Sequence, residues 1–244
     1  MTEPQPDRQR RKLYGRRKGP KLSAHQTELR RTLLSEIVFD QIRDALAQFP
    51  DSVRELWLEV GFGAGEHLFQ LAGENPDVGL IGAEPYESGV AKLLTKLANN
   101  PLNNVRIYEG DGRDIIMALP DASLARFFLL FPDPWPKTRH HKRRFLQMEM
   151  LDELARVLKP GAELRFATDD KSYLPYALER LAAHPAFEWT ARGASDWKRR
   201  PEGWPPTRYE AKAIKGPPSY LAWRRRTPDP ARSGPGPSGR TANS

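Results

Sequence analysis

Apolar residues along the chain form short runs that alternate with segments of helical periodicity. Runs of strand length occupy residues 56–60, 78–84, 105–111, 125–131 and 162–168. Segments with helical spacing follow them at residues 66–75, 87–100, 113–119, 143–158 and 173–184. Strands that alternate with helices predict an α/β fold with a mostly parallel sheet, helices on both faces and right-handed crossovers.

The two ends of the chain differ from this central region. Apolar residues at helical spacing from Leu29 to Phe49 predict one amphipathic helix, which Pro50 ends. Residues 1–22 are polar and basic, and residues 227–244 are rich in Pro, Gly and Ser, so neither has the apolar side chains to offset ordering entropy. We therefore expect a mobile basic arm over 1–22, a single domain over 23–226 and a disordered tail over 227–244.

Composition excludes several classes of chemistry. The chain has no cysteine, which removes disulfides, thiolate metal sites and cysteine nucleophiles. The five histidines show no metal-like spacing, so we expect no metal. No stretch approaches the roughly 20 apolar residues of a membrane helix, and the N-terminus lacks the apolar centre of a signal peptide. A cytoplasmic location with no membrane partner is expected.

Positive charge is gathered in three places. The formal net charge is +8, but residues 1–21, 137–144 and 224–244 are strongly basic, whereas the remainder carries an excess of acids. A basic periphery on an acidic body favours a polyanionic partner such as a nucleic acid. The alternative is that charged tails only keep the protein soluble.

The end of the first predicted strand carries the glycine-rich stretch LEVGFGAGEH. It contains Glu59, Gly61, Gly63 and Gly65, and glycines let the backbone pass close to a ligand. A dinucleotide site would have its third glycine at position 66, where this chain has Glu66. The pattern instead suits a cationic ligand without phosphates, namely S-adenosylmethionine. A purely structural tight turn is the alternative.

Acidic residues also end the next two predicted strands. Glu84 stands where a carboxylate can accept both hydroxyls of an adenosine ribose, and Asp111 where one could accept the adenine amine. Each taken alone could be a solvated loop residue. Acids at the ends of three successive strands favour a common ligand.

The stretch FPDPWPKTRHHKRR follows the fourth predicted strand, where a substrate atom would meet the methyl donor. Pro132 and Pro134 restrict the backbone around Asp133, and Trp135 could stack on a base or pack in the core. The basic run is predicted to begin the following helix. Because cations are unfavourable at a helix N-terminus, an external anion such as RNA phosphate would compensate them.

These motifs resemble those of a known family. PDPWPKTRHHKRR, the EVGFGAG turn, ATDD at 167–170 and TRYEAKA at 207–213 are together similar to the bacterial tRNA (guanine-N7)-methyltransferases, over residues 55–223. The resemblance implies a Rossmann-like class I S-adenosylmethionine-dependent methyltransferase fold. It also implies tRNA as partner and methyl transfer to N7 of guanosine 46 in the variable loop.

The resemblance assigns roles residue by residue. It implies cofactor contacts by Glu59, Gly61, Gly63, Gly65, Glu84, Asp111 and Asp133, with Asp133 also catalytic. It implies substrate contacts by Lys137, Asp169, Thr207, Arg208, Tyr209 and Glu210, and RNA contacts by Arg139, His140, His141, Lys142, Arg143 and Arg144. Asp169 and Glu210 could accept hydrogen bonds from guanine N1–H and its 2-amino group, or be ordinary surface acids.

Guanine N7 carries a lone pair and no proton, so catalysis would consist mainly of placement and electrostatics. Two other functions stay open. One is methylation of another RNA base, such as an exocyclic amine. The other is a noncatalytic tRNA-binding protein of the same fold.

Overall fold

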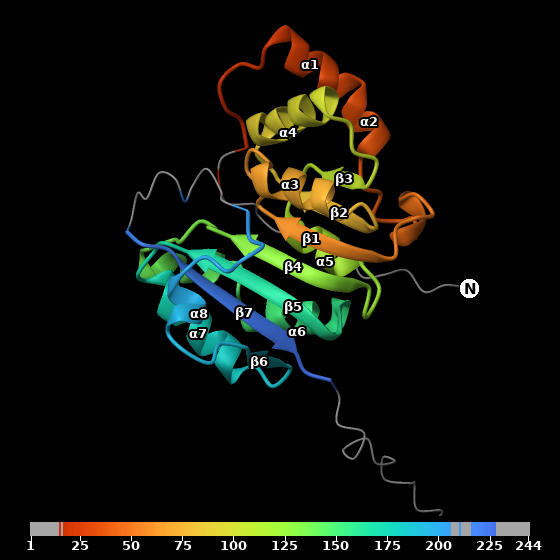
Figure 1. The fold of residues 1–244 in the computed structure, drawn as a ribbon. Helices are drawn as coiled ribbons and strands as arrows, with labels where there is room; N and C mark the ends of the chain where they lie inside the picture. Colours follow the sequence, from red (N-terminus) through yellow and green to blue (C-terminus); the bar gives the residue numbers. More distant parts are fainter. Residues whose placement is uncertain (1–14, 16, 206–209, 211–215, 228–244) are drawn as a thin grey trace, which may run out of the picture.

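The computed structural model describes residues 15, 17–205, 210 and 216–227. Within these residues seven strands form one sheet in the order β3-β2-β1-β4-β5-β7-β6 (Figure 1). The strands are β1 (Glu55–Val60), β2 (Val78–Ala83), β3 (Val105–Tyr108), β4 (Leu124–Leu130), β5 (Leu158–Thr168), β6 (Phe187–Trp189) and β7 (Ser219–Arg225).

Strands β1 to β5 run parallel, as predicted from the alternation of apolar runs and helical segments. Strand β7 is antiparallel to both β5 and β6. Its first residue, Ser219, pairs with Thr168, the last residue of β5. The start of β7 therefore lies at the same edge of the sheet as the carboxyl ends of the parallel strands.

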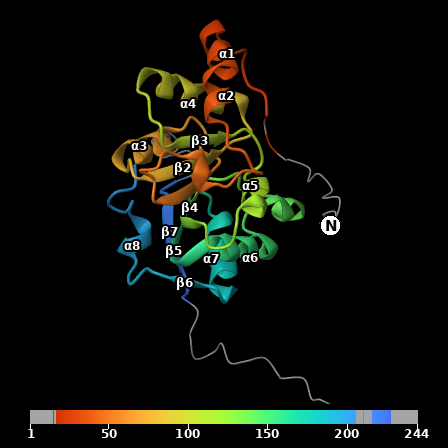
Figure 2. The same ribbon diagram turned by 90° about the vertical axis from the view of Figure 1, so that its right-hand side faces the viewer.

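Helices cover both faces of the sheet. They are α1 (Ala24–Arg31), α2 (Leu33–Ile37), α3 (Glu66–Glu74), α4 (Glu87–Asn99), α5 (Gly112–Ala118), α6 (Met148–Val157), α7 (Tyr173–Ala183) and α8 (Ser195–Lys198), with short 3₁₀ helices η1 (Leu46–Gln48) and η2 (Thr138–Arg143). Figure 2 shows α5 and α6 on one side of the sheet and α3 on the other. In the described part of the chain, no helix is long and apolar enough to cross a membrane.

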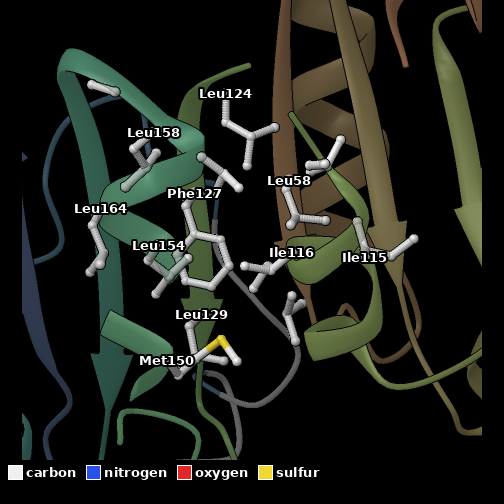
Figure 3. Packing of buried hydrophobic residues seen from close by; sticks show 14 of the residues in the cluster. Leu58, Ile115, Ile116, Leu124, Phe127, Leu129, Met150, Leu154, Leu158 and Leu164 are labelled. Carbon is white, nitrogen blue, oxygen red and sulfur yellow. The ribbon is translucent and has the colours of Figure 1, made fainter. Parts of the chain in front are cut away.

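The two faces of the sheet bury two apolar clusters. In one, Leu58, Phe127 and Leu164 from β1, β4 and β5 pack against Ile116 of α5 and Leu154 of α6 (Figure 3). All five side chains are fully buried, and each such burial stabilises the fold by roughly 1.5–3 kcal/mol. The second cluster joins the opposite face to α3 and α4. This packing holds the strand ends in place.

The helix predicted from Leu29 to Phe49 is wrong in its second half. Ser23 forms a capping box that starts α1, and α-helical structure ends with α2 at Ile37, with only the short 3₁₀ helix η1 after it before Pro50. Residues after it extend along the sheet edge, where the Phe39 N–H donates to the Ile107 carbonyl oxygen at 2.8 Å. Pairing with β3 therefore overrides the helical periodicity.

The basic run does not begin the following helix, which corrects a second prediction. It forms η2, and α6 starts only at Met148. Between them Arg144, Phe145 and Leu146 are buried. The N-terminus of α6 thus carries no cationic run and needs no external anion to compensate one.

Candidate functional site

A cavity of about 770 Å³ opens at the carboxyl ends of the parallel strands. Open α/β sheets bind their ligands at this edge. Six of the residues predicted to hold a cofactor line the cavity: Glu59, Gly61, Gly63, Glu84, Asp111 and Asp133. These residues come from the carboxyl ends of four different strands and the loops after them, so the fold brings together residues that are far apart in the sequence.

The glycine turn after β1 presents bare backbone to the cavity. Gly61 and Gly63 have φ angles of 75° and 59°, in the left-handed region that favours glycine. A Cβ at either position would have no described atom within 4 Å, so this space is open to a ligand. Gly65, with φ 73°, is the N-cap of α3 and does not line the cavity. Its Cβ would lie 2.8 Å from Cδ1 of Leu93, so its role is packing.

Glu59, one residue before the end of β1, is a buried carboxylate with a buried partner. Its Oε2 lies 2.8 Å from Nδ1 of His67, in the first turn of α3. Both side chains are almost fully buried, and both residues line the cavity. Among the described residues, Nε2 of His67 has no hydrogen-bond partner. The contact through Nδ1 therefore orients the carboxylate that faces the cavity.

Glu84 follows β2 and is held by two backbone donors. The N–H of Gly63 donates to its Oε2 at 2.8 Å, and the N–H of Tyr86 donates to its Oε1 at 2.9 Å. Burial raises the pKa of Glu84, and the carboxylates of Asp133 and Glu59 raise it further, although the two N–H donors oppose them. Glu84 thus links the glycine turn to the second strand end.

Asp111 caps a helix as well as lining the cavity. Its Oδ1 accepts the N–H of Arg113 at 3.0 Å and so caps α5. The guanidinium of Arg113 also lies 3.2 Å from Oδ2 of Asp111 and 4.8 Å from the ring centre of Phe145. A contact between Asp111 and an adenine amine would have to share this carboxylate with Arg113.

The loop after β4 places an exposed carboxylate at the cavity. Asp133 is exposed, between Phe131 and Trp135, whose φ angles are 50° and 47°. Left-handed backbone costs a bulky residue roughly 1–3 kcal/mol, and such strain concentrates at functional sites. Trp135 lines the cavity and meets the basic run, with its ring 6.0 Å from that of His140 and 5.0 Å from the guanidinium of Arg143.

The start of the described chain passes the same cavity. Gly15 is among its lining residues, and a Cβ there would lie 3.5 Å from Oδ2 of Asp133. The carbonyl oxygen of Arg17 accepts the N–H of Glu87, in the first turn of α4, at 3.0 Å. Part of the segment expected as a mobile arm therefore contacts the domain beside the site.

The predicted substrate residues are placed differently from the cofactor residues. Lys137, Asp169 and Glu210 do not line the cavity. Asp169 directly follows β5, and Glu210 accepts a short hydrogen bond from the hydroxyl of Tyr220, in β7. Because Tyr220 pairs with Ala167, Glu210 stands near the strand end that carries Asp169. The predicted contacts of Thr207, Arg208 and Tyr209 lie outside the described residues.

The side chains of the basic run differ in their exposure to solvent. Arg139 and Lys142 are exposed, His140, His141 and Arg143 are half-buried, and Arg144 is 1% exposed. The guanidinium of Arg144 donates to the carbonyl oxygens of Pro134 and Ser172 and to Oγ of Ser172. Arg144 is thus a correction to the predicted set of RNA contacts, because a buried and bonded side chain cannot meet a phosphate at the surface.

Three residues at the cavity were missed from the sequence. His67 lies eight residues after Glu59, a spacing that joins the end of β1 to the first turn of α3. Arg113, two residues after Asp111, and Tyr86, two after Glu84, also line the cavity. The sequence signal that could have identified them is their position shortly after the acidic residues at the strand ends.

Comparisons with other proteins identify the family of this chain. A family model described as "Putative methyltransferase" matches residues 53–219. The tRNA (guanine-N(7)-)-methyltransferase of Rhodospirillum rubrum is 44% identical over 243 residues, covering 95% of each chain. The tRNA (guanine-N(7)-)-methyltransferase of Paramagnetospirillum magneticum is 48% identical over 226 residues, covering 89% of this chain and 94% of the relative.

Solved structures share the fold. The 16S rRNA methyltransferase KamB is 16% identical with a TM-score of 0.52, covering 78% of this chain and 99% of that chain. An rRNA methylase from Streptococcus thermophilus is 12% identical with a TM-score of 0.50, covering 85% and 100%. These likenesses confirm the predicted Rossmann-like class I methyltransferase fold. The family model over residues 53–219 and the relatives at 44% and 48% identity show that the chain belongs to the bacterial tRNA (guanine-N(7)-)-methyltransferase family.

Proposed function

We propose that this protein transfers a methyl group from S-adenosylmethionine to N7 of guanosine 46 in the variable loop of tRNA. The observation that carries the proposal is the convergence of Glu59, Glu84 and Asp133 on one cavity beside bare glycine backbone. Relatives over 40% identical across most of the chain carry the name of this activity. The position 46 comes from the resemblance of the motifs.

The cavity fits the donor. Glu59 would accept hydrogen bonds from the ammonium group of the methionine part. Glu84 would accept hydrogen bonds from the two ribose hydroxyls. The open space at Gly61 and Gly63 leaves room for a ligand against the backbone. Carboxylates around a cavity favour a cation, because each adds to the negative potential inside it. S-adenosylmethionine supplies a methyl group on a positively charged sulfur.

The residues of the protein then need only to place the base next to the methyl group and to stabilise the charge that moves during the reaction. The lone pair of guanine N7 forms the new N–C bond as the S–C bond breaks, and the positive charge moves from sulfur to the purine. No proton is removed, so Asp133 would orient and stabilise rather than act as a base. Its exposed position at the cavity leaves it accessible to an incoming base.

The substrate must present guanine N7 outside a regular helix. In A-form RNA this atom lies in a deep, narrow groove that side chains cannot enter. A variable-loop guanosine can be unstacked and turned toward the cavity, at a modest energetic cost. Asp169 and Glu210 would then accept from N1–H and the 2-amino group, which adenine does not offer in that pattern.

The test is to incubate the purified protein with labelled S-adenosylmethionine and an unmodified tRNA transcript. Nucleoside analysis by mass spectrometry should identify N7-methylguanosine, and nuclease fragments should place it at position 46. A transcript with adenosine at position 46 is the matched control and should accept no label. Label in another nucleoside would favour the alternative of a different base. Failure to bind S-adenosylmethionine in calorimetry would favour a noncatalytic tRNA-binding protein.

A further inference from the structure

Arg144 ends the basic run but points into the protein. Its guanidinium donates through Nε to the carbonyl oxygen of Pro134 at 2.8 Å. On its other side, Nη1 donates to the carbonyl oxygen of Ser172 at 3.1 Å and Nη2 to Oγ of Ser172 at 2.8 Å. One planar group thus holds two loops that are separated by 38 residues of sequence.

These two loops carry the residues assigned to chemistry and to base recognition. Pro134 directly follows Asp133 in the loop after β4. Ser172 lies in the turn between β5 and α7, which contains Asp169, and its Oγ donates to Oδ1 of Asp170 at 2.7 Å. Asp170 also accepts the N–H groups of Ser172 and Tyr173, so the turn is internally braced.

The surroundings of Arg144 fix its orientation. Its guanidinium lies 4.9 Å from the ring centre of Tyr173 and 4.6 Å from that of Tyr176. The negative faces of both rings attract the cation, and this attraction is stronger for a desolvated guanidinium than for an exposed one. The Tyr173 hydroxyl accepts the N–H of Phe145 at 3.0 Å, which anchors the chain just after Arg144. These contacts therefore hold the Arg144 side chain in one conformation between the two loops.

We propose that Arg144 is a positioning residue that sets the distance between Asp133 and the base-reading turn at Asp169. This inference rests on the proposed function, because it assigns those two residues to one substrate. Lysine could not replace Arg144, because its ammonium group donates from a single nitrogen. The planar guanidinium donates from three nitrogens and so reaches the acceptors of Pro134 and Ser172 on opposite sides.

The matched control is Arg180. Its guanidinium lies 4.0 Å from the ring centre of the same Tyr176, so it makes the same kind of contact. Among the described residues its Nε has no hydrogen-bond partner. Arg180→Lys therefore removes a guanidinium from Tyr176 and keeps the connection that Arg144 makes between the loops.

Hydrogen–deuterium exchange of the protein alone tests the connection. In Arg144→Lys the amides of Asp133, Trp135, Ser172 and Tyr173 should all exchange faster than in the wild type. Arg180→Lys should leave them unchanged. Ser172→Ala, which removes the Oγ that accepts from Arg144 and donates to Asp170, should increase exchange at Asp133 and Trp135 to a smaller extent. Unchanged exchange at Asp133 and Trp135 in Arg144→Lys would overturn the proposal.

Single-turnover methylation tests the consequence. Because a displacement of about 1 Å can cost on the order of 100-fold, Arg144→Lys should lower the rate roughly 10- to 100-fold. The Kd for S-adenosylmethionine should stay within about threefold, since Glu59 lies in β1 and Glu84 directly follows β2, outside the two loops that Arg144 joins. A wild-type rate in Arg144→Lys, or an equal decrease in Arg180→Lys, would refute the positioning role. The exchange experiment needs no RNA. It therefore tests whether Arg144 connects the two loops even if the wild-type protein makes no N7-methylguanosine and the proposed function fails.

Discussion

The Nδ1 of His67 lies 2.8 Å from Oε2 of Glu59, and both side chains are almost completely buried in the wall of the cavity. A buried carboxylate needs hydrogen-bond partners, and one held in place loses less freedom when it binds a cation. The ring of His67 is itself held edge-on, 5.0 Å from that of Phe128. The pair therefore presents the carboxylate in one orientation.

Replacing His67 by Phe should weaken binding of S-adenosylmethionine about tenfold, because a hydrogen bond to a charged group contributes about 1.5–3 kcal/mol. Titration calorimetry measures this change. His184→Phe is the control, since Nε2 of His184 lies 3.1 Å from Oδ1 of Asp152, away from the cavity. It should lower thermal stability and leave the Kd unchanged. Equal Kd values for wild type and His67→Phe would show that the contact does not orient Glu59 for the ligand.

The raised pKa of Glu84 predicts a pH dependence of cofactor binding. As pH falls through this raised pKa the carboxylate takes up a proton, and it would then be a weaker hydrogen-bond acceptor for the ribose hydroxyls that we propose it binds. Affinity should therefore begin to decline at a pH above 4.5, the ordinary value. A cationic ligand favours the ionised form, so binding near this pH should release protons. Calorimetry in two buffers of different ionisation enthalpy measures that release, which Glu84→Gln should reduce.

Asp133→Asn separates charge from shape, because the side chain keeps its size. In the proposed reaction the carboxylate stabilises charge at the cavity, so we expect kcat to fall on the order of 100-fold, whereas the Kd for tRNA should stay the same. Labelled-methyl turnover and filter binding give the two values. Full turnover by Asp133→Asn would exclude any role for the charge.

The basic run without the buried Arg144 predicts salt-dependent RNA binding. A triple alanine variant at Arg139, Lys142 and Arg143 should lower the slope of log K against log salt by about 0.7–0.9 for each phosphate that is no longer neutralised. Arg54 and Lys159 line a small pocket on the amino side of the strands and provide the matched control. Their double alanine variant should keep the wild-type slope. An unchanged slope in the triple variant would remove these residues from the RNA interface.

Two glycines of the turn after β1 should respond differently to alanine. Both substitutions place a side chain at positive φ, which costs about 1–2 kcal/mol of unfolding free energy. Gly65→Ala should cost roughly 1–3 kcal/mol more, because its Cβ would overlap Leu93, whereas a Cβ at Gly61 meets nothing. Urea unfolding measures both. Gly61→Ala should instead show the larger decrease in cofactor affinity. Equal stabilities of the two variants would contradict the assignment of Gly65 to packing and of Gly61 to the space for the ligand.

The tertiary structure changed several of the interpretations made from the pattern. The helical spacing from Leu29 to Phe49 predicted helical structure that extends as far as Ile37, but not the hydrogen bond of Phe39 with Ile107 at the sheet edge. Likewise Arg144 belongs to a basic run that is typical of a surface, yet it is buried. In both cases a long-range partner decided the outcome, and local periodicity and charge contain no information about such a partner.

The parallel sheet, the glycine turn and the acids at successive strand ends could be predicted from the amino-acid pattern, because alternation, glycine content and strand boundaries are local properties. The pairing of Glu59 with His67, the capping of α5 by Asp111 and the connection that Arg144 makes between the loops of Pro134 and Ser172 became visible in the folded protein alone. Hydrogen bonds between buried groups depend on which elements pack together. That arrangement is set by the whole core and not by any single segment.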